Sequence, residues 1–272
     1  AHDPREARAR AGERRRLRPV MRCALVGSGS AGNALIVATD TTALLVDCGY
    51  SIKAFDARVA ALDFDPFDLS TVLVTHEHDD HLGGVLPLSR RYRVPVRWAR
   101  GTALAAIARH GADVEAEAFS PHAPFTVGDI EITPVPVPHD AREPTQFVFR
   151  HGERRLGVLT DLGSLTPHVV AAYADCDALC LEFNHDLERL RRSDYPPSLR
   201  QRIGGAWGHL SNAQAESLLA KLKGPTLKRV VAAHLSERTN HPDLVAECLA
   251  RVAPELDAVI ASQDAVVPWF EV

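Results

Sequence analysis

The sequence of 272 residues predicts an α/β protein. Short runs of apolar and β-branched residues alternate with longer stretches that have helical periodicity. Several histidines and acidic residues stand directly after the apolar runs, where α/β proteins place their functional sites. We interpret the chain as one domain, because this length lies within the range of a single large α/β domain.

The predicted strands are short and rich in Val, Ile, Leu and Ala, as buried strands are. They cover residues 23–26, 35–37, 43–46, 71–74, 130–132, 146–149, 156–159, 178–181 and 230–233. Apolar residues at helical spacing mark the predicted helices, which lie near residues 52–62, 101–110, 166–173, 211–222 and 242–252. Ser211 or Asn212 suits the N-cap of the fourth helix, since its side-chain oxygen can accept from a free backbone N–H.

The composition is that of a globular protein. Hydrophobic residues make up 46% and charged residues 24%. No apolar run approaches the roughly 18 residues that a membrane span needs. The five cysteines are scattered and form no CxxC pair, which argues against a disulfide framework or a zinc ribbon. We expect a cytoplasmic protein with no membrane contact.

Residues 1–20 differ from the rest of the chain. They contain seven arginines, three acidic residues and no hydrophobic stretch of the kind that a signal peptide has. Met21 is the only methionine and directly precedes the first predicted strand. We expect residues 1–20 to be a disordered basic extension, with a nucleic-acid-binding arm as the alternative, and residues 21–272 to form the folded domain.

The glycine-rich segment 27–32 follows the first predicted strand and matches the GxGxxG pattern of dinucleotide-binding proteins. That motif needs a helix directly after it, whose N-terminus binds the pyrophosphate. Residues 34–38 instead indicate a strand followed by a turn. We therefore predict a glycine-rich hairpin loop.

The segment 75–81, THEHDDH, is the most informative part of the sequence. His76, His78, Asp80 and His81 follow a predicted strand and place three imidazoles and a carboxylate within six residues. Packing does not explain such a cluster, because each polar group would need a partner in the core. Imidazole nitrogens with carboxylate oxygens suit zinc, and also manganese or iron. The segment predicts a metal-dependent hydrolase.

These four residues would leave two metal ions short of ligands. His139, Asp161 and His234 are the candidates to complete the site, and Asp161 and His234 directly follow predicted strand regions. We therefore expect two divalent metal ions, zinc or manganese, with iron as a further option.

The order of these motifs resembles the metallo-β-lactamase-fold hydrolases, and within them the YycJ/WalJ-like family of single-domain DNA exonucleases. The resemblance covers residues 21–272. It is carried by GSGSAGN at 27–33, THEHDDH at 75–81, HDA at 139–141, TDLG at 160–163, Glu182 with NHD at 184–186, YP at 195–196 with RI at 202–203, GHLSN at 208–212 and HLS at 234–236. Phe183 and Thr239 depart from the pattern near the presumed cleft.

The resemblance implies an αββα sandwich of two mixed β-sheets flanked by helices. It also implies a ligand set for two ions. The first ion would bind His76, His78 and His139, the second would bind Asp80, His81 and His234, and Asp161 would bridge them. A hydroxide held between the two ions would then attack a phosphodiester, and the substrate would be DNA digested from 5′ to 3′.

Further residues are candidates for catalysis and substrate binding. Asp80, Asp140 or Glu182 could orient ligands or receive a proton. The leaving oxygen needs a proton donor, for which we favour His209 over His185. The candidate substrate contacts are Asn184, Arg202, Ser211 and Asn212. Arg202 is the favoured member of an arginine cluster around Tyr195 that also contains Arg189, Arg191, Arg192 and Arg200.

Other functions share parts of this pattern. A flavodiiron oxygen reductase would carry glutamate in place of His78, and zinc β-lactamases usually lack a histidine in place of His81. Small phosphodiesterases and thioesterases share all seven ligands and remain alternatives. A metal-bound regulatory protein in cell-wall signalling, without turnover, is the alternative from a different class.

Overall fold

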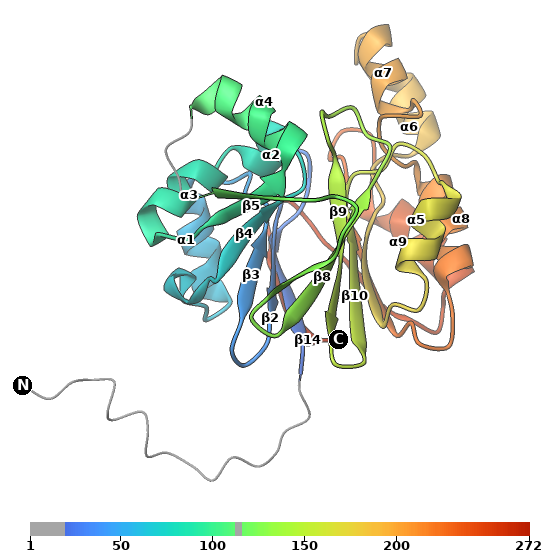
Figure 1. The fold of residues 1–272 in the computed structure, drawn as a ribbon. Coiled ribbons are helices and arrows are strands. Elements are labelled where there is room, and N and C mark those ends of the chain that lie inside the picture. Colours follow the sequence, from blue (N-terminus) through green and yellow to red (C-terminus); the bar gives the residue numbers. More distant parts are fainter. Residues whose placement is uncertain (1–19, 112–115) are drawn as a thin grey trace, which may run out of the picture.

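The computed structural model describes residues 20–111 and 116–272, and in them two β-sheets face each other with helices on both outer surfaces (Figure 1). This is the αββα sandwich of two mixed β-sheets that the resemblance implied. The expected basic extension at residues 1–20 lies outside the described residues except for Val20.

The first sheet has seven strands in the order β14-β1-β2-β3-β4-β5-β6. Antiparallel pairs join β14 to β1, β1 to β2 and β2 to β3, whereas β3 to β6 are parallel. The strands are β1 (Arg22–Gly27), β2 (Ala34–Ala38), β3 (Ala43–Val46), β4 (Thr71–Val74), β5 (Val96–Ala99), β6 (Ala116–Phe119) and β14 (Val267–Glu271).

The second sheet also has seven strands, in the order β13-β12-β11-β10-β9-β8-β7. Here β7 to β10 are antiparallel and β10 to β13 are parallel. The strands are β7 (Phe125–Val127), β8 (Ile130–Pro136), β9 (Thr145–His151), β10 (Arg154–Leu159), β11 (Ala178–Glu182), β12 (Arg229–Ala233) and β13 (Asp257–Ile260).

The helices divide between the two outer surfaces. The first sheet is covered by α1 (Ile52–Ala61), α2 (Asp79–Leu82), α3 (Val85–Tyr92) and α4 (Arg100–His110). The 3-10 helix η2 (Pro66–Asp68) lies between α1 and β4 in the chain. The second sheet carries α5 (Pro167–Tyr173), α6 (Leu187–Arg192), α7 (Pro197–Ile203), α8 (Asn212–Leu222) and α9 (Pro242–Val252). No helix of the described residues is long and apolar enough to cross a membrane.

The core has three layers because each central strand is apolar on both faces. In β3, Leu44 and Val46 join the layer between the sheets, whereas Leu45 packs in the layer beneath the helices of the first sheet. In β12, Val231 points between the sheets and Val230 packs under the helices of the second sheet. This period of two explains why these strands appear in the sequence as continuous apolar runs.

All nine predicted strands and all five predicted helices are present within a few residues of their expected ends. The prediction missed α2, α3, α6 and α7, and it missed strands β5, β6, β7, β13 and β14. Several of these have little apolar pattern. β6 is mostly exposed at the sheet edge, β13 has no fully buried residue, and α2 has only four residues. The segment 27–32 is the predicted loop between antiparallel β1 and β2, which excludes the helix that a dinucleotide site needs.

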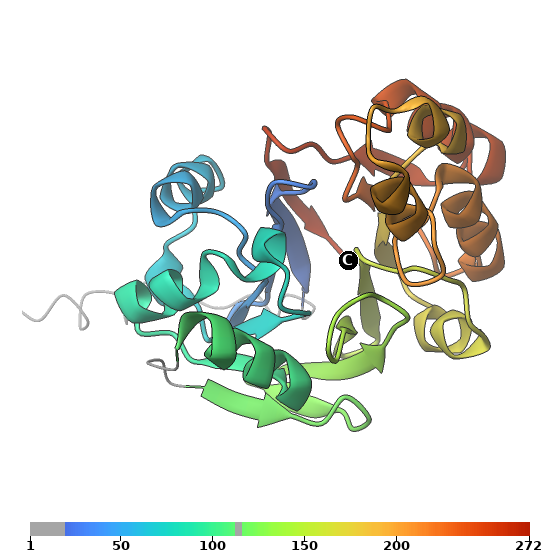
Figure 2. The same cartoon turned by 90° about the horizontal axis from the view of Figure 1, so that it is seen from above.

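The strand ends bring the polar residues together. Asp47 follows β3, the histidine-rich segment follows β4, Asp161 comes shortly after β10, Glu182 ends β11 and His234 follows β12. Seen from above, the two helical layers lie on opposite sides of the strand ends (Figure 2). One edge of the sandwich therefore collects side chains from both sheets.

Candidate metal centre

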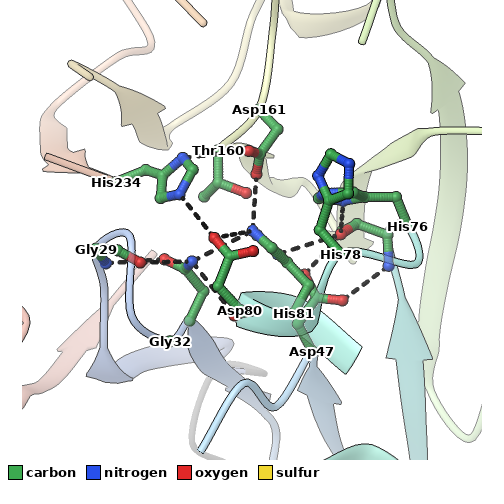
Figure 3. A network of polar contacts seen from close by, with 12 residues as sticks. Gly29, Gly32, Asp47, His76, His78, Asp80, His81, Thr160, Asp161 and His234 are labelled. Atoms are coloured by element: carbon green, nitrogen blue, oxygen red, sulfur yellow. Dashed lines mark hydrogen bonds and ion pairs between the residues drawn. The ribbon is translucent and has the colours of Figure 1, made fainter. Parts of the chain in front are cut away.

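The predicted metal ligands meet at this edge of the sandwich. Figure 3 shows His76, His78, Asp80, His81, Asp161 and His234 there. His76, His78 and His139 form one group that could hold a metal ion. Nε2 of His76 lies 2.9 Å from Nδ1 of His78, and Nε2 of His139 lies 3.3 Å from the same atom. Three ring nitrogens that converge in this way are a typical nitrogen ligand set for zinc.

A second group consists of Asp80, His81 and His234. Oδ2 of Asp80 lies 3.5 Å from Nε2 of His81 and 3.4 Å from Nε2 of His234. Two imidazoles and a carboxylate again suit a divalent cation.

Asp161 stands between the two groups. Its Oδ2 lies 3.2 Å from Nε2 of His81, and its Oδ1 lies 3.8 Å from Nε2 of His139. Only 1% of the residue is exposed, yet neither carboxylate oxygen has a hydrogen-bond partner in the part of the chain that the structure describes. A buried carboxylate without partners is costly unless a cation neutralises it. The residues present therefore fit a divalent metal ion at this position.

Asp47 contacts His81, a member of the second group. Its Oδ2 lies 2.8 Å from Nδ1 of His81 and accepts from the Thr75 hydroxyl at 2.7 Å. Its Oδ1 accepts from the backbone N–H of Thr75 at 2.8 Å. A carboxylate on Nδ1 places the ring proton there and leaves the lone pair of Nε2 free to bind a metal. Asp47 thus sets the tautomer of His81.

His139 is oriented in a similar way, because its Nδ1 lies 2.9 Å from the carbonyl oxygen of Gly208. The ring can donate to that carbonyl and keep Nε2 as an acceptor. Nδ1 of His76 lies 2.9 Å from the hydroxyl of Thr75. The ring nitrogens that face the cavity are therefore the ones left free for a metal.

Glu182 joins two histidines on the side of the second sheet. Its Oε1 lies 2.8 Å from Nδ1 of His209 and 3.2 Å from Nδ1 of His234. Its Oε2 accepts from the backbone N–H groups of Leu162 and Leu210. The carboxylate is fully buried, so it holds both rings in fixed orientations.

Two non-glycine residues in this region have left-handed backbone conformations. The φ angle is 59° at Asp47 and 55° at His234. Such conformations cost on the order of 1 to 3 kcal/mol and persist where the surroundings enforce them. At His234 the backbone N–H donates to the hydroxyl of Ser28 at 2.8 Å, which fixes the turn.

The electrostatics favour a cation. Burial lowers the pKa of His76 and of His139, which keeps both imidazoles neutral. Burial alone would also lower the pKa of His81 and of His234, but the surrounding carboxylates, Asp161 foremost, together outweigh it and raise both. The carboxylates thus attract positive charge into the site, and a metal ion can supply that charge in place of the protons.

A cavity of about 310 Å³ opens above these ligands and is lined by His78, Asp80, His209 and His234. Asn184 and Arg202, two of the predicted substrate contacts, also line it. The Arg202 guanidinium contacts Asp140, whereas the other arginines of the cluster do not line this cavity. A larger hollow of about 580 Å³ between α1, η2 and α3 contains no histidine and lies apart from the ligands.

Other predicted site residues have different roles in the structure. Ser211 is buried, and its hydroxyl caps α8 by accepting from the Gln214 N–H. The buried Asn212 exchanges two amide hydrogen bonds with Asn240. Their polar side-chain atoms are therefore already used within the fold, and neither residue lines the cavity.

His185 is fully buried outside the lining of the cavity, and both of its ring nitrogens lack partners among the described residues. The departures Phe183 and Thr239 are fully buried as well and do not line the cavity. Their side chains therefore form no part of the cavity wall.

Sequence reasoning gave no role at the metal centre to Asp47 or Asn33. Nδ2 of Asn33 lies 3.2 Å from Nε2 of His81 and contacts the Asp80 carbonyl at 3.5 Å. The position of Asp47 directly after a buried strand was the available signal. For Asn33 the signal was its place at the end of the glycine-rich loop.

Comparisons with known proteins agree with this geometry. Residues 42–235 match the description "Beta-lactamase superfamily domain". The chain is 35% identical to "Exodeoxyribonuclease YycJ" of Bacillus anthracis over 234 residues, which cover 85% of this chain and 88% of the relative. It is 32% identical to "Exodeoxyribonuclease WalJ" of Streptococcus pneumoniae, over 81% of this chain and 83% of the relative.

Solved structures show the same fold. The metallo-β-lactamase-fold protein YhfI from Bacillus subtilis matches with a TM-score of 0.73 at 17% identity, over 94% of this chain and 100% of that one. A diphosphatase from the PhnP family matches with a TM-score of 0.66 at 19% identity, over 93% of this chain and 99% of that one. With its histidine and aspartate cluster, its fold and its relatives, the chain belongs to the beta-lactamase superfamily and, within it, to the family of YycJ and WalJ.

Proposed function

We propose that residues 21–272 form a metal-dependent phosphodiester hydrolase that digests DNA from the 5′ end. The single observation that carries this proposal is the buried Asp161, whose two oxygens lack hydrogen-bond partners among the described residues and face histidines of both ligand groups. The relatives at 35% and 32% identity, which are named exodeoxyribonucleases, support DNA as the substrate.

We assign His76, His78 and His139 to one ion, Asp80, His81 and His234 to a second, and Asp161 to both. Both sets of three residues are among the groups of converging donor atoms, which supports this division, and a third group joins Asp161 to His76 and His81. Zinc or manganese suits the mixed nitrogen and oxygen donors. Two such ions would supply a bridging hydroxide as the nucleophile and would neutralise charge on the phosphate.

The chain's own residues would bind and orient the substrate. Arg202 lines the cavity and carries a positive charge that can contact a phosphate oxygen. Asn184 also lines the cavity, and its Nδ2 donates to the carbonyl oxygen of His234 at 3.0 Å. Asp80 also lines the cavity, so its carboxylate can hold a ligand in place or receive a proton during the reaction.

We assign His209 the role of proton donor to the leaving oxygen. Its Nδ1 is bound to Glu182, which leaves Nε2 as the nitrogen available to the substrate. His209 lines the cavity and its side chain is 21% exposed. The buried His185 does not line the cavity, so we prefer His209 for this step.

We place the enzyme in the cytoplasm. All five cysteines are unpaired, as is usual in a reducing compartment. We therefore propose an intracellular nuclease.

The test of this proposal is a substrate panel with the full chain and either manganese or zinc. Single-stranded DNA, double-stranded DNA, RNA, a small phosphodiester and a thioester are incubated with the wild type and with His76→Ala. We expect metal-dependent digestion of DNA by the wild type and none by the variant. Turnover of the thioester or the small diester with all nucleic acids intact would refute the nuclease assignment.

A further inference from the structure

Trp207 is an exposed aromatic residue beside the cavity. Trp207 is 63% exposed, although tryptophan is usually well covered by other residues in folded proteins. The next two residues along the chain, Gly208 and His209, both line the cavity of the metal centre. Since consecutive Cα atoms are about 3.8 Å apart, the backbone of Trp207 lies directly next to the lining of that cavity.

The backbone that carries Trp207 is a tight turn fixed to the fold. The N–H of Gly208 donates to the carbonyl of Gly205 at 3.0 Å, and the N–H of His209 donates to the carbonyl of Ile203 at 2.8 Å. These two bonds anchor the turn at its end and against α7. Trp207 therefore occupies a central position of a hydrogen-bonded turn and does not depend on a free loop for its placement.

Two glycines let this turn pack closely. A Cβ atom on Gly163 would lie 2.6 Å from the Cα of Trp207, and a Cβ atom on Gly208 would lie 2.1 Å from the carbonyl oxygen of Arg202. Neither the Cα of Trp207 nor the carbonyl of Arg202 could move away without a shift of the main chain. The sequence thus holds the turn in one position against the loop after Asp161 and against the end of α7.

The same turn is linked to the metal centre. The carbonyl oxygen of Gly208 lies 2.9 Å from Nδ1 of His139, and His209 follows directly and binds Glu182. The backbone of Trp207 is therefore held at a fixed place relative to the metal ligand His139 and to His209, the assigned proton donor.

We propose that the indole of Trp207 stacks on a base of the nucleic-acid strand whose phosphate lies at the metal centre. This inference rests on the proposed function. An exposed indole offers a flat surface on which any base can stack. Tyr195, which also lines the cavity, has the Arg238 guanidinium 4.6 Å from its ring centroid, whereas no aromatic or cationic group is stacked on Trp207 among the described residues. Trp207 positions the strand and takes no part in the bond cleavage.

The first part of the test measures binding without cleavage. The full chain is titrated with single-stranded DNA in the presence of a chelator, and tryptophan emission is followed. Trp98 is buried and the indole N–H of Trp269 donates to Leu62, so Trp207 is the indole most open to a base. We expect quenching in the wild type that is largely lost in Trp207→Phe.

The second part compares two substrates with manganese present. One is an ordinary oligonucleotide, and the other lacks bases next to the scissile phosphate. Trp207→Ala should raise KM for the ordinary substrate about 5- to 100-fold, the usual effect of removing one stacking side chain, with a much smaller effect on kcat. The abasic substrate should show much less of this change, and Trp207→Phe should restore part of it.

Phe67→Ala is the matched control, because Phe67 is 70% exposed and lines the separate hollow between α1, η2 and α3. An equal rise in KM on both substrates, or unchanged quenching in Trp207→Phe, would overturn the stacking role while DNA cleavage by the wild type stands. A wild type that binds DNA with base-dependent quenching but cleaves none of it would instead overturn the proposed function and leave the stacking role intact.

Discussion

Asp47 and His81 form a fully buried carboxylate–imidazole pair in which Oδ2 lies 2.8 Å from Nδ1. The pair lies directly beneath the proposed second metal ion, since the opposite nitrogen of His81 faces Asp80 and Asp161. Asp47 is held in turn by the hydroxyl and the backbone N–H of Thr75. A residue that contacts no substrate thereby decides which nitrogen of His81 is free.

Replacing Asp47 should therefore weaken metal binding. In Asp47→Asn, with the amide oxygen kept toward the backbone N–H of Thr75, the NH₂ group would take the place of Oδ2, face Nδ1 of His81 and favour the tautomer that carries its proton on Nε2. We expect the affinity for zinc to fall about 10- to 100-fold, as with other partners that orient metal ligands. Isothermal titration of the metal-free chain measures it. Asp257→Ala, an exposed aspartate paired with Arg229, is the control and should bind as the wild type does.

Metal ions should stabilise the folded chain. A ligand that binds only the folded state at 100 times its Kd adds about 2.7 kcal/mol to the free energy of unfolding. We expect zinc or manganese to raise Tm in the wild type, and a chelator to reverse the rise. Asp161→Asn should show a much smaller rise because it lacks the charge that faces both groups. Equal rises in Tm for the two proteins would contradict the assignment of Asp161.

Loss of His209 should slow hydrolysis most for substrates with a poor leaving group. An ordinary alkoxide needs a proton as it departs, whereas an activated nitrophenolate does not. His209→Ala should slow the first type of substrate on the order of 10²- to 10⁴-fold and the second far less. Glu182→Gln should show the same selectivity in weaker form, since Glu182 orients the ring. Equal slowing of both substrates would show that His209 is not the proton donor.

Acid should weaken a link between the sheets that lies away from the metal centre. The Thr39 hydroxyl donates to Oδ1 of Asp129 at 2.8 Å and joins the β2–β3 turn to the β7–β8 turn. Burial tends to raise the pKa of Asp129, but hydrogen bonds from Thr42 and Thr39 outweigh it and lower the pKa. Because the folded pKa lies below the unfolded one, this stabilisation is present above the ordinary aspartate pKa of about 4 and is lost as pH falls through the folded value.

The measurement for this link is urea unfolding of the wild type and Asp129→Ala at several pH values. We expect the wild type to be more stable by about 1 kcal/mol at neutral pH, the usual value of such a hydrogen bond. The difference should shrink in acid. His151 also lies near this carboxylate, with Nδ1 3.6 Å from Oδ2, so Thr39→Val is needed to assign the effect to the hydroxyl. A difference that stays constant from neutral pH into acid would contradict the explanation.

The sequence pattern predicted the central strands because these strands are buried on both faces. Leu44 and Leu45 belong to different layers of the core, so β3 is apolar throughout and easy to recognise. β13 and β6 carry exposed residues at sheet edges and have no such pattern. The helices α6 and α7 are short and rich in arginine, so their few apolar positions gave no clear period.

The candidate ligands could be named from the sequence because imidazoles and carboxylates follow strands that end at one edge. Contacts between distant residues could not be read in this way. Ser211 and Asn212 stand in a motif that suggests substrate binding, yet one caps a helix and the other pairs with Asn240, 28 residues away. His139 is oriented by the backbone carbonyl of Gly208, and every residue has such a carbonyl, so the residue types in the sequence do not reveal this contact.

The most direct test of the account is the release of mononucleotides from single-stranded DNA labelled at its 5′ end, measured with manganese for the wild type and for Asp161→Asn. The account predicts rapid release of the labelled nucleotide by the wild type, and its loss both with a chelator and in the variant. Intact DNA in the presence of the metal-loaded wild type, or digestion that neither the chelator nor the variant reduces, would contradict it.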